Sequence, residues 1–191
     1  ASATVPGYVS GANILVSPAA TVTYQLVSVT DNSSCTASTL TGTPTVTVHP
    51  QVTPSFPVAS ADVCLGTTGV NYITDSGGGE TNYVWTVSAG GVISSGGTAA
   101  DAFAVIDWTN AAGPQSVSVS YTDGFGCNSA TTVFAVNVAQ LTDTQVVTDN
   151  TRCTAPFDGS IAITTAGAVG ALTYDWNGPT GPLSGQTITN L

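Results

Sequence analysis

The sequence predicts an all-β protein made of tandem β-sandwich modules in an elongated array. Three observations support this prediction. Apolar and polar residues alternate along several segments, which is the pattern of half-buried strands. No segment of helical length repeats apolar residues at spacings of three and four. Motifs recur after about 90 residues, a repeat length typical of immunoglobulin-like sandwiches.

Four segments carry the alternation most clearly, and in each the apolar residues fall on one face of the expected strand. The change of phase within the first segment predicts a bulge or burial on both faces. A tight turn at Ala89–Gly91 is expected to lead into a further strand at Val92–Ser94. The four segments and their apolar residues are Thr21–Thr30 (Val22, Tyr24 and Leu26, then Val27 and Val29), Thr81–Ser88 (Tyr83, Trp85, Val87), Gln115–Asp123 (Val117, Val119, Tyr121) and Thr132–Val138 (Phe134, Val136, Val138).

Two kinds of cysteine motif recur along the chain. The pattern T-D-x-x-x-C occurs at Thr30–Cys35 and again at Thr122–Cys127, each time between a Val/Ser strand and a Thr-rich strand. Cys64 and Cys153 each precede a small-residue turn and a new strand. The first motif therefore closes a module, and the second opens one.

The order of these motifs predicts the domain boundaries. Residues 1–49 are interpreted as the closing, C-terminal half of an immunoglobulin-like module, and residues 51–139 as a complete module. Residues 140–191 are interpreted as the opening half of a third module, so we expect the chain to be a segment of a longer protein. Residues 49–54, with two prolines, are expected to be a stiff linker.

The charge composition excludes two classes of protein. The 191 residues contain 11 acidic side chains, one basic side chain (Arg152) and no lysine, which gives a net charge of −10. Binding to nucleic acid and to anionic lipid both require clustered basic residues. No apolar run reaches the roughly 20 residues of a membrane helix. A surface rich in Thr, Ser and Gly with almost no cations is typical of an exported protein, so we expect an extracellular location.

The middle module resembles the PKD-like and Ig-like repeats of very large bacterial surface proteins. The matching pieces are Cys64–Gly66, Tyr83–Trp85, Val117–Asp123 and Gly126–Cys127. The segment Cys153–Leu191 resembles the first part of a SprB-type repeat of the gliding-motility adhesins of Bacteroidetes. It carries the matching pieces Asp158–Ile161, Tyr174–Gly178 and Asn190–Leu191.

This resemblance implies type IX secretion, display on the cell surface and no catalysis. The expected function is that of a filament stalk in adhesion or gliding motility. The implied partners are neighbouring repeats of the same chain and, further, lateral fibre partners or surface polysaccharide. The alternative function is a carbohydrate-binding accessory region of a secreted multidomain enzyme, and an exposed pair of tryptophans would favour it.

The four cysteines are interpreted as disulfide-forming residues of an oxidising compartment. Cys64 and Cys127 open and close the complete module, so we predict a disulfide between them. Cys35 and Cys153 belong to half modules, so we predict that they are unpaired within this chain. The absence of C-x-x-C spacing and of histidine partners argues against a zinc site.

No group of residues predicts catalysis, and we expect no cofactor. His49, the single histidine, is interpreted as a linker residue rather than a triad base. Glu80 and the scattered aspartates do not form the carboxylate pair of a glycosidase. Asp31 and Asp123 occupy equivalent turns, where they are interpreted as turn caps, with calcium binding as the alternative.

The three tryptophans are candidates for either core packing or sugar stacking. Trp85 and Trp176 lie in Y-x-W strands and are expected to fill a sandwich core. Trp108 closes its strand, so it is the candidate for stacking against a ligand.

Overall fold

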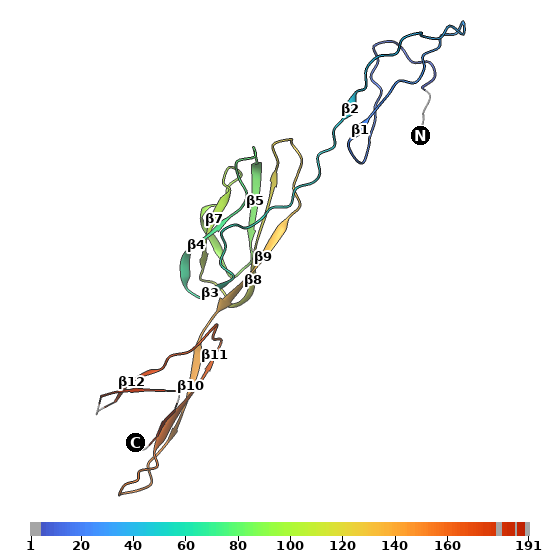
Figure 1. Cartoon of the computed structure of the whole chain (residues 1–191). Coiled ribbons are helices and arrows are strands. Elements are labelled where there is room, and N and C mark those ends of the chain that lie inside the picture. The colour runs from blue at the N-terminus through green and yellow to red at the C-terminus, as the bar shows by residue number, and fades with distance from the viewer. Residues whose placement is uncertain (1–4, 179–180, 186, 190–191) are drawn as a thin grey trace. The chain divides into compact units, whose positions relative to one another are not determined.

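The computed structural model describes residues 5–178, 181–185 and 187–189, and these residues form strands, turns and loops without any helix (Figure 1). The prediction of an all-β protein is confirmed. Contacts divide the chain into two compact units, Ala1–Pro50 and Gln51–Leu191.

Within residues 5–50 of the first unit, the structure has one short antiparallel pair of strands, β1 (Val22–Thr23) and β2 (Thr45–Val46). The predicted strand Thr21–Thr30 is therefore mostly extended chain without a ladder. No residue among 5–50 is buried. Because a strand with one apolar face needs a second layer to cover it, this unit lacks the packing that would hold a longer ladder.

Seven strands of the second unit form two sheets. The first sheet has the order β3-β9-β8-β5 and the second the order β4-β7-β6. Strand β3 runs parallel to β9, and every other neighbouring pair in these two sheets is antiparallel. The strands are β3 (Asp62–Cys64), β4 (Thr67–Ile73), β5 (Thr81–Val87), β6 (Val92–Gly96), β7 (Phe103–Trp108), β8 (Gly113–Thr122) and β9 (Thr132–Ala139).

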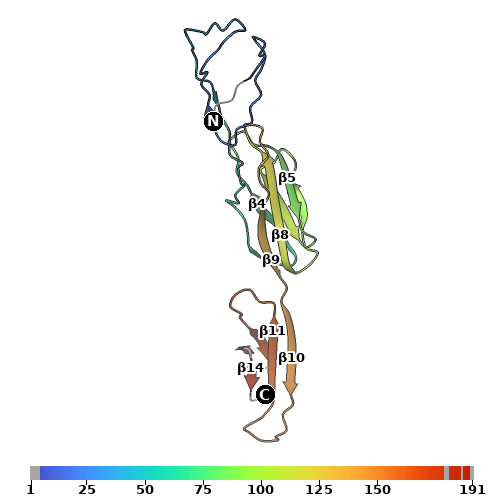
Figure 2. The same cartoon turned by 90° about the vertical axis from the view of Figure 1, so that its right-hand side faces the viewer.

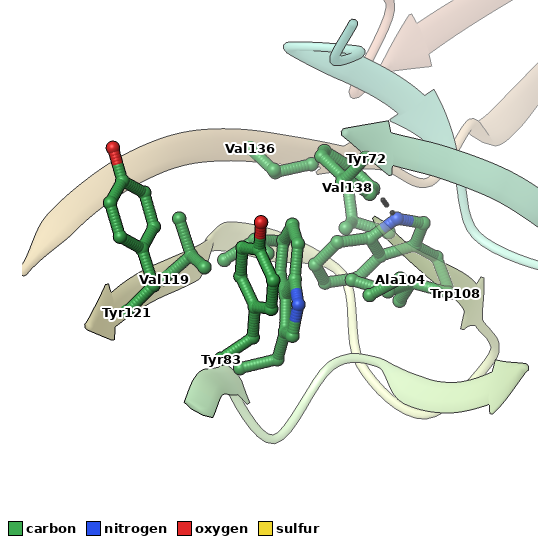
Figure 3. Close-up of a cluster of buried hydrophobic side chains, with 11 residues drawn as sticks. Tyr72, Tyr83, Ala104, Trp108, Val119, Tyr121, Val136 and Val138 are labelled. Atoms are coloured by element: carbon green, nitrogen blue, oxygen red, sulfur yellow. Dashed lines mark hydrogen bonds between the residues drawn. The ribbon is translucent and has the colours of Figure 1, made fainter. Parts of the chain in front are cut away.

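A common core lies between these two sheets (Figure 3). The alternation predicted from the sequence places the expected faces of β5, β8 and β9 in this core, and residues on the opposite faces, such as Val84 and Val133, are exposed. The arrangement is compatible with the predicted β-sandwich. The buried apolar residues are Tyr72, Tyr83, Trp85, Ala104, Ile106, Trp108, Val117, Val119, Tyr121, Val136 and Val138.

The predicted linker at residues 49–54 is in part a piece of this core domain, which corrects the interpretation. The Ala130 N–H donates to the Val52 carbonyl at 2.9 Å. The Thr132 hydroxyl donates to the carbonyl of Pro54, a residue that is itself buried. Residues 51–54 thus run along the start of β9, and Val52 packs against the core.

Among the described residues after β9, five further strands form two small sheets. One has the order β10-β11-β14, and the other is the pair β12-β13 (Figures 1 and 2). Strands β10 and β11 pair along seven residues, yet every residue of β10 is exposed. The strands are β10 (Thr142–Thr148), β11 (Ser160–Ala166), β12 (Asp175–Gly178), β13 (Gly181–Ser184) and β14 (Thr187–Thr189).

Candidate functional site

The repeated T-D-x-x-x-C motif forms the same turn in both units. Asp31 Oδ1 accepts hydrogen bonds from the N–H groups of Ser33 and Cys35, at 2.9 and 2.8 Å. Asp123 Oδ1 accepts from Phe125 and Cys127 at the same two distances. In each turn the aspartate N–H also donates to the carbonyl of the cysteine.

These contacts explain why aspartate stands at this position. An aspartate side chain can satisfy backbone donors of a tight turn, and each of these two carboxylates caps two N–H groups. A calcium ion needs several oxygen ligands from a site. Among the described residues no group of three or more His, Cys, Asp or Glu side chains lies close enough together to hold a metal ion. The four hydrogen bonds to these two carboxylates show that Asp31 and Asp123 cap their turns.

The predicted disulfide between Cys64 and Cys127 is not formed, and both thiols are free. Cys64 pairs with Ala139 at the end of β9, whereas Cys127 lies in the turn that precedes β9. The length of that strand separates them by more than about 20 Å, while a disulfide requires Cα atoms within about 7 Å. Cys64 and Cys127 therefore lie at opposite ends of the sheet, although one opens the module in the sequence and the other closes it.

Cys35 and Cys153 are also free in the structure, and both are exposed. Cys35 occupies the last position of the first repeated turn, as Cys127 does in the second. In both turns the cysteine N–H and carbonyl, rather than the thiol, carry the turn's hydrogen bonds. The backbone of these cysteines is therefore part of the turn, whereas each thiol is free.

Trp108, the candidate for ligand stacking, is fully buried, so that prediction is wrong. Its exposed fraction is 0%. The Trp108 Nε1–H donates to the Tyr72 hydroxyl at 3.2 Å, as Figure 3 shows, and that hydroxyl donates to the Ser60 carbonyl at 3.0 Å. The strand end that suggested exposure is covered, because the neighbouring strand β4 lays Tyr72 against the indole with ring centroids 6.3 Å apart.

The other two tryptophans differ from each other. Trp85 fills the core as predicted, with its Nε1–H donating to the Asp101 carbonyl at 2.9 Å. Trp176 is half-buried, and its Nε1–H donates to the Gly185 carbonyl at 2.7 Å. Since β12 pairs only with β13 among the described strands, its Trp side chain has less cover than Trp85.

A polar cluster at the edge of the core was not predicted from the sequence. Asp75 follows β4 and accepts hydrogen bonds from the Ser55 N–H and hydroxyl and from the Tyr121 hydroxyl. The Tyr83 hydroxyl donates to the Asp75 carbonyl at 3.1 Å. Tyr83 and Tyr121 pack edge to face, with centroids 5.6 Å apart. This cluster fastens the segment at Ser55 to the loop after β4.

The electrostatics of this cluster follow from burial and from the carboxylate. Burial raises the pKa of Asp75, but hydrogen bonds from Ser55 and Tyr121 outweigh it and hold that pKa below its ordinary value. Burial and the negative charge of Asp75 raise the pKa of Tyr121 to about 12. Burial also raises the pKa of Tyr83, with Glu80 and Asp75 adding to it. Both phenols are protonated at neutral pH and act as donors.

Two other residues singled out in the sequence have local roles. Glu80 Oε2 accepts from the Gly78 N–H at 2.8 Å and so closes the glycine-rich loop before β5. His49 lies in the first unit, two residues before the segment that packs along β9, and is exposed.

No family model, no curated protein and no solved structure matches the chain. Within the described residues, no helix has the length and apolar character needed to cross a membrane.

Proposed function

We propose that the chain is a non-catalytic repeat segment of a large, secreted bacterial adhesin displayed on the cell surface. In this proposal the modules form a filament stalk that serves adhesion or gliding motility. Residues 51–139 act as an immunoglobulin-like or PKD-like module, and residues 140–191 as the opening half of a SprB-type repeat. The neighbouring repeats of the same chain are its main partners.

One observation carries this proposal. The turn at Asp31 and the turn at Asp123 have the same hydrogen bonds although they lie in different units, so the chain uses one structural element repeatedly. Tandem repetition of a small domain suits a long array, since each repeat extends the chain by the same unit. We propose further that successive modules of the parent protein follow one another in an elongated array.

The strand order of the middle module supports its proposed class. An immunoglobulin-like sandwich pairs its second, fifth and fourth strands in one sheet and its third, sixth and seventh strands in the other. Here β4-β7-β6 and β9-β8-β5 have those two orders, and β3 joins β9 in parallel as a first strand.

The alternative, a carbohydrate-binding region, has lost its main support. It required exposed tryptophans arranged as a stacking platform, and both Trp85 and Trp108 lie in the core. Affinity electrophoresis in gels containing soluble polysaccharides gives a direct check. We expect no retardation of the chain, whereas retardation that is abolished by free oligosaccharide would support the alternative.

The proposal is tested by deleting residues 51–139 in frame from the gene of the parent protein. We expect shorter surface filaments and weaker attachment of cells, with secreted hydrolase activity unchanged. A matched control replaces the exposed Val133 with Thr, which leaves the core intact and should leave filaments unchanged. Loss of an enzymatic activity with normal filaments would overturn the proposal.

A further inference from the structure

Residues 51–58 form a strap that runs from one sheet of the middle module to the other. Near its start, the Val52 carbonyl accepts a hydrogen bond from the Ala130 N–H at 2.9 Å. At its end, the Val58 carbonyl accepts from the Ile73 N–H, also at 2.9 Å. The strap therefore connects β4, in the second sheet, with the residues just before β9, in the first.

Few backbone hydrogen bonds attach the strap. Pro54 and Pro57 have no N–H group, so the strap cannot form a continuous ladder with a neighbouring strand. In the part of the chain that the structure describes, its one β-bridge joins Val58 to Ile73. Strands β8 and β9, by comparison, pair along seven residues. Segments with few backbone bonds and few buried contacts open at a lower free energy than a core sheet.

One aromatic side chain of the strap packs on the core. Phe56 contacts Trp85 and Phe134, with ring centroids 6.0 and 5.4 Å apart. Phe56 is half-buried, whereas Trp85 is 8% exposed. Lifting Phe56 away would uncover part of Trp85 and Phe134. It would break none of the hydrogen bonds that pair β5 with β8 and β8 with β9.

Polar contacts with Asp75 hold the middle of the strap in place. The Asp75 carboxylate accepts hydrogen bonds from the Ser55 N–H, at 2.7 Å, and from the Ser55 hydroxyl. It also accepts from the Tyr121 hydroxyl on β8, at 3.3 Å. The Ser55 carbonyl accepts from the hydroxyl of Thr74, a residue only 1% exposed, at 2.9 Å. Through Asp75, the strap is joined to both sheets.

We propose that residues 51–58 open as a unit while both sheets stay folded, and that the hydrogen bonds between Asp75 and Ser55 hold them closed. Residue 51 directly follows the first compact unit, so opening transfers eight residues from the module to the connection between the two units. Eight extended residues span at most about 26–29 Å. The strap thus lengthens this connection reversibly. The proposal goes beyond the adhesin function and does not depend on it.

Native-state hydrogen exchange of the 191-residue chain, followed by NMR, measures this opening. The reporter amides are Ser55, Ile73 and Ala130, whose N–H groups donate across the contacts of the strap. We expect one common opening constant for these three amides, at least roughly tenfold larger than that of amides in the β8–β9 ladder. Its dependence on urea should be shallow, because opening the strap exposes far less surface than unfolding does.

The variant Asp75→Ala tests what holds the strap closed. It removes the acceptor of both Ser55 hydrogen bonds, so the opening constant measured at Ile73 and Ala130 should rise by roughly tenfold. The β8–β9 ladder should keep its protection. If Asp75→Ala unfolds the module, Ser55→Ala removes only one hydroxyl from an exposed residue and should raise the opening constant several-fold.

Asp101→Ala is the matched control. The Asp101 carboxylate also accepts hydrogen bonds from one N–H and one hydroxyl, both of Thr98, but within the loop between β6 and β7. This variant removes the same kind of contact at a place that does not touch the strap. It should leave the exchange of Ile73 and Ala130 unchanged.

Thiol labelling gives a second measurement of the opening. Pro54 is buried, so the thiol of a Pro54→Cys chain should react with a soluble disulfide reagent only while the strap is open. The four native cysteines are replaced by serine for this purpose. Labelling should become roughly tenfold faster when Asp75→Ala is added, and Asp101→Ala should not change it.

Three outcomes would overturn the proposal. The first is exchange of the strap amides with the same opening constant and urea dependence as the β8–β9 ladder, which would mean that the strap opens only when the module unfolds. The second is unrelated opening constants for Ser55, Ile73 and Ala130, which would mean that the strap is not a unit. The third is an equal effect of Asp75→Ala and Asp101→Ala on labelling of the Pro54→Cys thiol.

Discussion

The residue before the cysteine of the repeated turn must adopt a left-handed backbone conformation. This position holds Ser34 in the first unit and Gly126 in the second, with φ angles of 65° and 83°. L-residues with a side chain pay about 1–2 kcal/mol for this left-handed conformation, and glycine does not. Asparagine adopts it more readily than alanine because its side chain forms local hydrogen bonds.

We therefore predict that Gly126→Ala lowers the free energy of unfolding of the second unit by about 1 kcal/mol, with Gly126→Asn costing less. A Cβ atom at this position would meet no atom within 4 Å, so the loss comes from the backbone and not from a clash. Urea unfolding followed by tryptophan fluorescence measures the difference. An equal loss for both variants would contradict the argument.

A second prediction at the residue scale concerns the effect of Asp75 on the pKa of Tyr121. Tyr121 ionises at a pKa of about 12 when folded against 10 for an unperturbed tyrosine, with burial and then Asp75 as the causes. Its protonated form is therefore favoured by folding, and this contribution to stability is lost as pH rises from about 10 to about 12. Asp75→Asn removes the negative charge and should lower the pKa of Tyr121.

The change is measured as phenolate absorbance during alkaline titration, with Tyr121 assigned from the difference to a Tyr121→Phe chain. Glu80→Gln serves as the control and should lower the pKa less, because Glu80 acts on Tyr121 through its charge alone. Identical titrations of the Asp75→Asn chain and the unsubstituted chain would show that Asp75 does not influence the phenol.

At the scale of elements, the strands that were predicted and those that were missed differ in their sequence pattern. Strands β5, β8 and β9 alternate strictly, because one face lies in the core and the other in solvent. Strand β4 was expected only as the new strand after the turn that follows Cys64, without bounds, and its register shift between Thr67 and Val70 interrupts the alternation that would have marked them. Strand β3 has three residues, which is too short for a period to show.

The sites were harder to predict than the strands, because a site depends on which strands are neighbours. The Asp75 cluster joins a loop after β4 to tyrosines on β5 and β8, and no spacing in the sequence reports that proximity. The cover over Trp108 comes from Tyr72 on β4. For Cys64 and Cys127 the sequence separation resembled that of a closed module, but the direction of β9 sets them apart.

The positions of Cys64 and Cys127 lead to a prediction for the stability of the second unit. Cys64 ends β3 and Cys127 lies beyond β8, so the pair cannot stabilise the sandwich by a crosslink. The urea midpoint of the second unit should be the same with and without reductant, and Cys64→Ser should change its stability by less than about 0.5 kcal/mol. A loss of about 4 kcal/mol on reduction would instead indicate a closed loop.

At the scale of the whole molecule, the near absence of basic residues leaves a single site for cleavage by trypsin, which cuts after Lys or Arg. Arg152, the single Lys or Arg of the sequence, lies in the loop between β10 and β11, where its side chain is exposed. Its Nε is 3.5 Å from Asp158 Oδ2, and Asp158 also accepts hydrogen bonds from the Thr151 N–H and hydroxyl. These contacts hold the loop in place without covering it.

Trypsin should therefore cut the native chain once and release residues 1–152 and 153–191, which mass spectrometry can identify. Asp158→Ala removes the ion pair and the Thr151 contacts, so cleavage should become several-fold faster. The exposed Asp143 has neither contact with the loop, and Asp143→Ala should leave the rate unchanged. Resistance of the native chain to trypsin would contradict the exposure of this loop.

The parallel pairing of β3 with β9 has a consequence for how the middle module responds to tension. The two strands point the same way, so pulling residue 51 and residue 139 apart slides them along each other in shear. Backbone bonds such as Leu65 N–H to Ala139 O and Asn137 N–H to Ala61 O, both 2.7 Å, then share the load and break together instead of unzipping in turn. Single-molecule pulling should show one rupture peak for this module, and Leu65→Pro, which removes one donor, should lower its force.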